Sequence, residues 1–261
     1  MRLKPGENRI VFRAVDIRDN IAEMTIKILR IIPTVHRIDE RMVVSMLPFY
    51  LMGEVQEISP VAYDNLVSAI VEQGRFKFVD RTKVEEIVRE LRLSAEELVN
   101  PAYTLKVGKL TQAEGMIMGF IREAPDSIEI YAQLVDVETG EILTEKDAFD
   151  QDKGLDALKY LTRGLSIRLR EDFPLIEGRI LEAQGRNLVI DLGKNQRLKP
   201  GMRVIFFKEL EMIDPESGIK LGTATEKLGL GRIESVYQRT SLVKPITKFE
   251  IKLEKENVIT K

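Results

Sequence analysis

The sequence predicts a mixed α/β protein that begins with a β-hairpin and ends in a small all-β barrel. Three observations predict this class. Residues 8–28 alternate apolar with polar side chains, and helix-capping residues alternate with short apolar runs over 41–172. From Leu175 onward, short β-type runs are separated by glycine turns. We therefore expect three domains, which are residues 1–40 (hairpin and linker), 41–172 (α/β) and 173–261 (barrel).

Composition narrows the chemistry available to the chain. At 261 residues, it is long enough for two or more domains, and 44% hydrophobic with 31% charged residues is typical of a globular protein. Cysteine is absent and His36 is the single histidine, so one chain can form no disulfide, zinc finger or thiol nucleophile. We expect no cofactor and no metal site.

No segment of the sequence predicts a membrane helix or a secretory signal. The longest apolar run, Met42 to Met52, includes Ser45 and Pro48 and is shorter than the roughly 20 residues that a membrane helix needs. The first residues pass directly into a polar turn, which differs from a signal peptide. If this protein is exported, the sequence shown is a processed or truncated form.

The N-terminal residues predict a hairpin followed by a linker. Ile10, Phe12 and Ala14 alternate before the turn at Asp16–Asn20, and the alternation resumes after it. This stretch resembles the last two strands of bacterial immunoglobulin-like modules; a hairpin docked on the next domain is the alternative. In the linker, His36 has no ligand partner at metal-binding spacing, so we expect a surface histidine.

The central block predicts short strands and capped helices. Strands are expected at 43–49, 76–79, 115–121, 127–137 and 141–145. Helices are expected to start at Ser59-Pro60, at Thr82 with Glu85, at Ser94 with Glu97 and at Asn100-Pro101, and a further helix is expected over 153–171.

The C-terminal block changes to a β-type pattern. Short strands are expected at 178–182, 187–191, 202–207, 231–236 and 242–243. Glycine-containing turns separate them, and several short strands at such spacing favour a small barrel of the SH3- or OB-like kind.

The central block is similar to the curli assembly/transport component (CsgG) family, and its α/β layout also resembles that of the TolB amino-terminal type. The resemblance covers about 130 residues and runs through a strand that ends in Leu47-Pro48-Phe49. Its other motifs are Gly74-Arg75-Phe76, Val79-Asp80-Arg81, Leu98-Val99-Asn100-Pro101, Gly108-Lys109-Leu110 and the turn Asp136–Glu141. Gln112-Ala113-Glu114-Gly115 departs from the Gly-Ala-Asp stretch that is usual in the family.

The last block resembles the carboxy-terminal domain of the flagellar assembly protein FlgT over about 70 residues. Its motifs are Glu177-Gly178-Arg179-Ile180, Val189–Gly193, Leu198–Met202 and Asp214–Gly218. Arg197 stands where the related proteins often have glycine, so we expect Asn195 to take any left-handed conformation in that turn.

These resemblances imply a non-enzymatic scaffold or assembly protein, periplasmic or associated with the outer membrane. Its expected partners are proteins of an envelope machine of the secretion, flagellar or curli type, and the chain is expected to form a homo-oligomer or a ring. A CsgG-like secretion pore is the first alternative. We favour a ring or scaffold subunit, because the block leaves little sequence for membrane strands of about 9–11 residues.

One apolar stretch is a candidate partner contact. Phe49, Tyr50, Leu51 and Met52 follow a strand end, where loops are usually solvated. Consecutive apolar residues at such a place could form an exposed patch for another subunit. The alternative is that they continue the core beneath the helix that follows.

Catalysis and nucleic-acid binding are both disfavoured by the sequence. A Ser–His–Asp triad would have to use His36 in the linker, and Asp136 and Asp214 are expected to accept turn amides rather than bind metal. Residues 41–172 carry 16 Lys/Arg and 24 Asp/Glu, while 175–245 carry 12 and 9. The basic balance of the barrel keeps nucleic-acid binding as a second alternative, with Phe206, Phe207 and Tyr237 as its stacking candidates. The asymmetry fits head-to-tail subunit contacts or packing within one chain.

Overall fold

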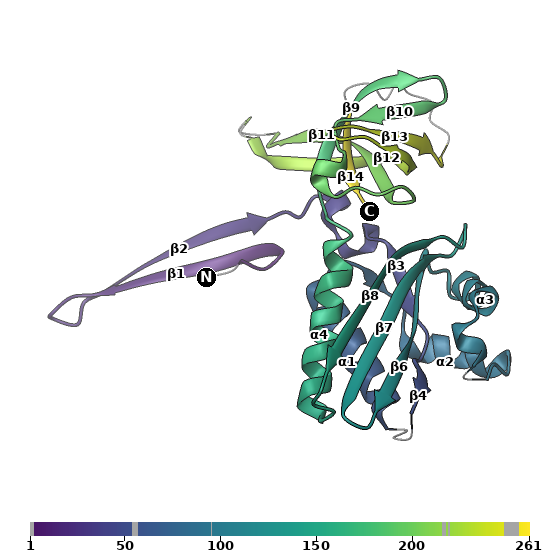
Figure 1. The fold of residues 1–261 in the computed structure, drawn as a ribbon. Helices are drawn as coiled ribbons and strands as arrows, with labels where there is room; N and C mark the ends of the chain where they lie inside the picture. The colour runs from purple at the N-terminus through teal and green to yellow at the C-terminus, as the bar shows by residue number, and fades with distance from the viewer. Residues whose placement is uncertain (1–2, 54–56, 95, 216–217, 219, 248–255) are drawn as a thin grey trace.

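The computed structural model describes residues 3–261 apart from 54–56, 95, 216–217, 219 and 248–255. The described chain forms a two-stranded hairpin, a mixed sheet with helices on both faces, and a closed barrel (Figure 1). The predicted class, mixed α/β with a C-terminal all-β barrel, is confirmed at this level.

The N-terminal hairpin extends away from the rest of the molecule (Figure 1). Strands β1 (Gly6–Val15) and β2 (Ile21–Arg30) pair antiparallel without a register shift. The Asp16 carboxylate accepts the main-chain N–H groups of Arg18 at 2.7 Å and Asn20 at 2.9 Å, which fixes the turn. The predicted hairpin is therefore confirmed. Two 3₁₀ turns, η1 (Thr34–His36) and η2 (Ile38–Glu40), connect it to the sheet.

The central sheet has the strand order β5-β3-β6-β7-β8, with β4 also paired to β6. Strands β3, β4 and β5 run parallel to their neighbours, whereas β6, β7 and β8 form an antiparallel meander. The bounds are β3 (Val43–Met46), β4 (Tyr50–Met52), β5 (Lys77–Phe78), β6 (Gly115–Ala124), β7 (Ser127–Asp136) and β8 (Ile142–Asp150).

Helices cover the two faces of this sheet unequally. The long helices α1 and α4 lie side by side on one face, and α2 and α3 lie on the other (Figure 1). The bounds are α1 (Ile58–Gln73), α2 (Arg81–Glu90), η3 (Glu97–Val99), α3 (Pro101–Thr111) and α4 (Leu155–Glu171).

Two of the predicted helix caps form and two do not. Asn100 accepts the Ala102 N–H at 3.0 Å, and Ser94 and Glu97 exchange the two bonds of a capping box. For α2, the cap is Asp80 rather than Thr82, because the Asp80 carboxylate accepts the Thr82 N–H at 2.7 Å. For α1, Ser59 lies inside the helix and does not cap it.

The barrel closes through the order β10-β13-β12-β11-β14-β9. Its predicted strands are present, but β11 and β12 are longer than expected and form an extended hairpin. Arg197 itself takes the left-handed conformation, with φ 62°, so the expectation that placed it at Asn195 is wrong. The bounds are β9 (Glu177–Gln184), β10 (Asn187–Ile190), η4 (Lys194–Gln196), β11 (Arg203–Ile213), β12 (Lys220–Val236), β13 (Ser241–Pro245) and β14 (Asn257–Thr260).

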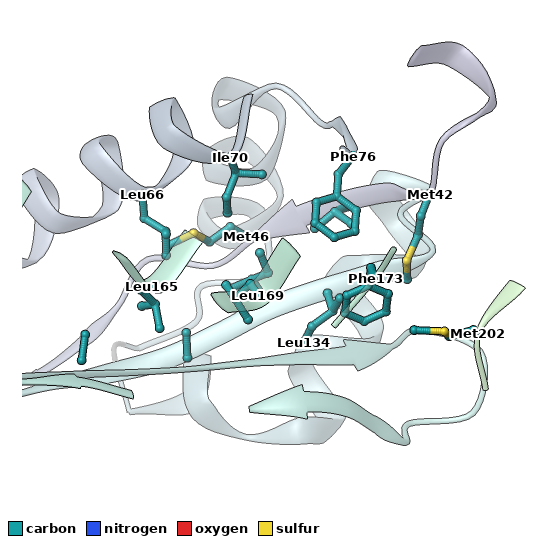
Figure 2. Close-up of a cluster of buried hydrophobic side chains, with 14 of the residues drawn as sticks. Met42, Met46, Leu66, Ile70, Phe76, Leu134, Leu165, Leu169, Phe173 and Met202 are labelled. Carbon is teal, nitrogen blue, oxygen red and sulfur yellow. The ribbon is translucent and has the colours of Figure 1, made fainter. Parts of the chain in front are cut away.

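One apolar core runs through the sheet, its long helices and the barrel. Figure 2 shows Leu66 and Ile70 of α1 packed toward Met46, with Phe173 next to the sheet. Phe173 meets Phe76 edge-on at a centroid distance of 5.6 Å. Met202 continues the cluster into the barrel, so the two parts pack against each other through apolar as well as charged contacts.

Candidate functional site

The sheet exposes part of one face. Alternate residues of a strand point to opposite faces, so Ile117 and Ile121 of β6 pack beneath α1 and α4. Met116 and Met118 point the other way and pack beneath α2 and α3. The residues that follow them on this second face, Phe120 and Arg122, are half-buried and exposed, respectively.

Strand register brings side chains from four strands together on this exposed area. Tyr50 pairs with Phe120, which pairs with Tyr131, and the next row aligns Met52 with Arg122. We call this area the open sheet face, and its residues are Tyr50, Met52, Phe120, Arg122, Glu129, Tyr131, Asp147 and Phe149.

The centre of the open sheet face is an aromatic pair held by charged neighbours. The rings of Phe120 and Tyr131 are stacked, with centroids 5.0 Å apart and planes at 18°. The Arg122 guanidinium lies 5.6 Å from the Phe120 centroid and 3.0 Å from a carboxylate oxygen of Glu129. These contacts orient the side chains before any partner arrives, which reduces the entropy lost on binding.

Tyr131 is oriented further by a hydrogen bond. Its hydroxyl donates to Oε2 of Glu145 at 2.6 Å. This bond to a carboxylate, together with burial, raises the pKa of Tyr131 to about 12. The hydroxyl therefore stays protonated at physiological pH and acts as a donor, not as a nucleophile.

Two apolar side chains on the open sheet face are largely accessible. Phe149 of β8 is 60% exposed and Met52 of β4 is 46% exposed. Aromatic residues, methionine and arginine are enriched in protein interfaces, and here they stand next to Glu129 and Asp147. The arrangement can bind an apolar surface of another protein and contains no evident reactive group.

The four predicted contact residues divide between core and surface. Phe49 is buried and Leu51 packs on the core beneath α1, where the Ser59 hydroxyl donates to the Phe49 carbonyl at 2.7 Å. Tyr50 and Met52 point to the open sheet face. Whether these two residues contact a partner remains a prediction, and the continuous patch of four is not formed.

Phe120, Tyr131 and Phe149 belong to the open sheet face but were not singled out from the sequence. Each stands in a strand at a position that alternates with buried residues, such as Ile121, Ile130 and Ala148. The available signal was this period of two with aromatic residues on the outward side. Recognising it required the register between strands.

A second cluster of charged residues joins the sheet to the barrel. We call it the junction cluster; its members are Glu114, Asp136 and Glu138 on the sheet side and Arg203, Arg232 and Lys261 on the barrel side. Arg203 lies 2.9 Å from Glu114 and 3.3 Å from Asp136, and Arg232 lies 2.9 Å from Asp136. The acidic residues 41–172 and the basic barrel therefore contact each other within one chain.

Asp136 is the buried centre of the junction cluster. One of its oxygens accepts the N–H groups of Glu138 and Thr139, both at 2.9 Å, so the expected turn-amide role is confirmed. Burial opposes ionisation, but the Thr139 N–H bond and the charges of Arg203 and Arg232 outweigh it and lower the pKa of Asp136. Asp214 also lies in a turn, where its main-chain oxygen accepts the Gly218 N–H at 2.9 Å.

Other candidate chemical groups are also in structural contacts. His36 is partly exposed and lies 2.9 Å from Glu177. Among the described residues, no group of three or more His, Asp or Glu side chains is placed to hold a metal ion. Three residues were candidates for stacking on nucleic-acid bases. Of these, Phe206 and Phe207 are fully buried and Tyr237 is exposed.

No helix in the described part of the chain has the length and apolarity needed to cross a membrane.

The chain matches one family model over residues 60–147, described as peptidoglycan-synthase activator LpoB. The match covers about a third of the 261 residues and includes all of α3, β6 and β7. No curated protein matches the chain.

Several solved structures are similar to parts of the chain. The LpoB C-terminal domain from Salmonella enterica is 18% identical, with TM-score 0.37, over 42% of this chain and 83% of that one. Lipoprotein GNA1162 from Neisseria meningitidis is 14% identical, with TM-score 0.40, over 51% and 99%. A PelC dodecamer from Paraburkholderia phytofirmans is 10% identical, with TM-score 0.35, over 60% and 94%.

The curli and flagellar assignments are wrong. Residues 60–147, which carry most of the motifs of the CsgG resemblance, match the LpoB family model instead, and no finding supports the flagellar likeness to FlgT. The physical reason is that those motifs mark local structure. Asn100 caps a helix and Asp136 forms a hairpin turn, and such features recur in unrelated α/β proteins. The expected curli or flagellar machine and the alternative of a CsgG-like pore rested on those two families, so they are withdrawn with them.

Proposed function

We propose that this protein is a non-enzymatic component of the bacterial envelope that acts by binding another protein, and that its partner is a peptidoglycan synthase. The observation that carries the proposal is the match of residues 60–147 to the family of peptidoglycan-synthase activators. The proposed location is periplasmic, in association with the outer membrane, where a synthase-activating protein would meet its enzyme.

The open sheet face is the proposed contact surface. Much of it, including Phe120, Arg122 and Tyr131, lies within the matched residues, and Met52 and Phe149 extend it on both sides. Its stacked aromatic pair is ordered by Arg122 and by Glu145, so a partner would meet a preformed surface. Exposed aromatic side chains in such surroundings often dominate binding energy.

A non-catalytic role is supported by how the charged groups are used. The buried carboxylate of Asp136 is neutralised by Arg203 and Arg232, and Glu114 is paired with Arg203 and Lys261. Despite burial, the pairing lowers the pKa of both carboxylates, so neither is available as a general acid at neutral pH, and it holds them in contacts within the fold. The function is therefore assigned to surface contacts.

The proposal is tested by binding and activity measurements with purified synthases of the source organism. Each synthase is immobilised in turn, the affinity of the 261-residue chain is measured, and glycan polymerisation is then followed with and without the chain. We expect one synthase to bind and to polymerise glycan faster. Phe149→Ser should weaken that binding about 30-fold or more, the loss expected at an interface hot spot.

Tyr160→Ser provides the matched control. Tyr160 is an exposed aromatic residue of α4, on the side of the sheet opposite the open face. Its replacement should leave affinity unchanged. If no synthase binds, the proposed function is wrong; if a synthase binds and Phe149→Ser behaves like Tyr160→Ser, the function stands and the contact surface lies elsewhere.

A further inference from the structure

The two faces of the N-terminal hairpin differ in charge. One face carries Ile10, Phe12 and Ala14 of β1 beside Ala22, Met24 and Ile26 of β2. The other face mixes the charged residues Glu7, Arg9, Arg13, Glu23 and Lys27 with the exposed apolar residues Val11, Val15, Ile21 and Leu29. On it, Arg13 lies 3.7 Å from Glu23 and Lys27 lies 3.5 Å from Glu7. The first set is called the apolar hairpin face below.

The apolar hairpin face is accessible although its composition is that of a core layer. Phe12 is 51% exposed, Met24 is 57% exposed and Ile26 is 39% exposed. The hairpin extends away from the sheet and the barrel, so neither part covers this face (Figure 1). A two-stranded hairpin is only marginally stable alone in water, and a second layer on its apolar face would stabilise it.

We propose that the second layer is the same hairpin of another copy of this chain, packed face to face across a two-fold axis. The apolar hairpin face fits itself in shape. Ile10 and Ile26 form a row of large side chains on one side of the Phe12–Met24 row, and Ala14 and Ala22 form a row of small ones on the other. An axis through the Phe12–Met24 row places each large row over a small row, as interdigitated layers require.

Charge and molecular shape agree with this pairing. The six residues of the apolar hairpin face are uncharged, so they meet without repulsion, and Arg30, which follows them on the same side at the base of the hairpin, donates to the Leu3 main-chain oxygen. The ion pairs of the outer faces stay in water. The same axis makes the two hairpins run in opposite directions. The sheet and barrel of one copy then lie at one end of the four-stranded contact, and those of the other copy lie at the other end. These parts therefore do not collide.

The size of the contact predicts a weak dimer. Strands of ten residues are about 34 Å long, and a two-stranded face is about 10 Å wide, so roughly 700 Å² in total is buried. This lies below the area of a standard stable complex. The dimer should therefore form at micromolar to near-millimolar concentration and dissociate on dilution.

Sedimentation equilibrium of the full chain over that range tests the proposal. Two adjacent residues with equal exposure on opposite faces form a matched pair, namely Phe12 at 51% and Val11 at 50%. Phe12→Glu should raise the dimer dissociation constant at least tenfold, whereas Val11→Glu should change it less than threefold. A chain that is monomeric at every concentration, or a pair of variants with equal effects, overturns the proposal.

A cross-linking experiment covers the case in which Phe12→Glu unfolds the hairpin itself. The chain has no cysteine, so Met24→Cys and Thr25→Cys each introduce a single thiol, on the apolar and charged faces respectively. The axis brings the two copies of position 24 together across the layers, as inter-sheet disulfides require. Oxidation should yield a covalent dimer with Met24→Cys and none with Thr25→Cys. If the two variants cross-link equally, or neither does, the face belongs to another occupant, such as a different protein or a bilayer.

Discussion

The carboxylate of Asp136 stabilises both a turn and a tertiary contact. Its Oδ1 accepts two main-chain N–H groups of the turn between β7 and β8, and its two oxygens also accept from Arg203 and Arg232 of the barrel. Because the side chain is fully buried, water cannot replace any partner that is lost. The position therefore tolerates an ionised carboxylate and little else.

Asp136→Asn should destabilise the protein by about 3 kcal/mol, because it leaves two guanidinium groups near a neutral amide at a buried site. Glu138→Gln is the matched control, since Glu138 contacts the same two arginines but its side chain is 65% exposed. That change should cost less than about 1 kcal/mol. The free energy of unfolding in urea measures both, and equal losses would contradict the account.

The turn role of Asp136 was predictable from sequence, but its arginine partners were not. The turn bonds join residues two and three positions apart. The partners Arg203 and Arg232 stand 67 and 96 positions away. Local chemistry determines the first set, whereas the second depends on how the barrel packs on the sheet. The charge asymmetry between the two parts was the only advance sign of that packing.

The helix starts show that a capping pattern in the sequence does not determine which residue caps the helix. The spacing of Thr82 and Glu85 is that of a capping box, yet Asp80 caps α2 and Glu85 forms an ion pair with Arg81 at 2.5 Å. Ser59 similarly binds the Phe49 carbonyl, which anchors the strand end beneath α1. Asp is as good a cap as Thr, and the strand before α2 ends early enough to place Asp80 there.

Replacing Asp80 and Thr82 one at a time shows which of the two residues caps α2. Asp80→Ala should lower the free energy of unfolding by about 1 kcal/mol, because an N–H group of the first turn loses its acceptor. Thr82→Ala should lower it by no more than about 0.3 kcal/mol, since the Thr82 main chain donates and its side chain does not cap. Thermal and urea unfolding provide the values; a larger loss for Thr82→Ala would restore the capping box.

The long β11–β12 hairpin and the open sheet face show where sequence patterns lose information. Residues 208–213 and 220–221 are mostly exposed on both faces, so the period of two that marks a half-buried strand is weak there. In contrast, β6 begins with a continuous apolar run and β7 alternates clearly, and both strands were predicted. Their outward aromatic residues form one surface only through the register between strands, which one sequence does not encode locally.

The sheet and the barrel share a continuous core and a charged junction. Met202 and Phe173 join the apolar clusters of the two parts, and Arg75 crosses between them, with Nη2 donating to the Lys261 main-chain oxygen at 2.9 Å. Burial and the nearby charge of Arg41 lower the pKa of Arg75 to about 10, so it remains charged at neutral pH. The division into three domains at residues 40 and 172 remains a prediction, and we expect the last two to unfold together.

Acid should weaken the packing of the barrel against the sheet. Asp172 bonds to Lys146 and Lys199, both at 2.8 Å, and these contacts outweigh burial and lower its pKa to about 2. Glu114 and Asp136 are also shifted down. A folded-state pKa below the unfolded value gives stability that is complete above about pH 4 and lost as pH falls toward about 2. The free energy of unfolding should drop by roughly 1–3 kcal/mol over that window.

Asp172→Asn controls for the carboxylates outside this contact. It should be less stable than the natural chain at pH 7 and should lose less on acidification, because one of the shifted groups is gone. Urea unfolding at several pH values between about 2 and about 7 gives both curves. Parallel curves would show that Asp172 does not contribute to the acid response.

The most direct test is a hydrogen-exchange footprint of the chain bound to the synthase proposed as its partner. We expect slower amide exchange in β4 and β8, which flank the open sheet face, and no change in the exposed surface of α4 around Tyr160. Protection confined to α4 or to the barrel, with β4 and β8 unchanged in a complex that forms, would contradict this expectation.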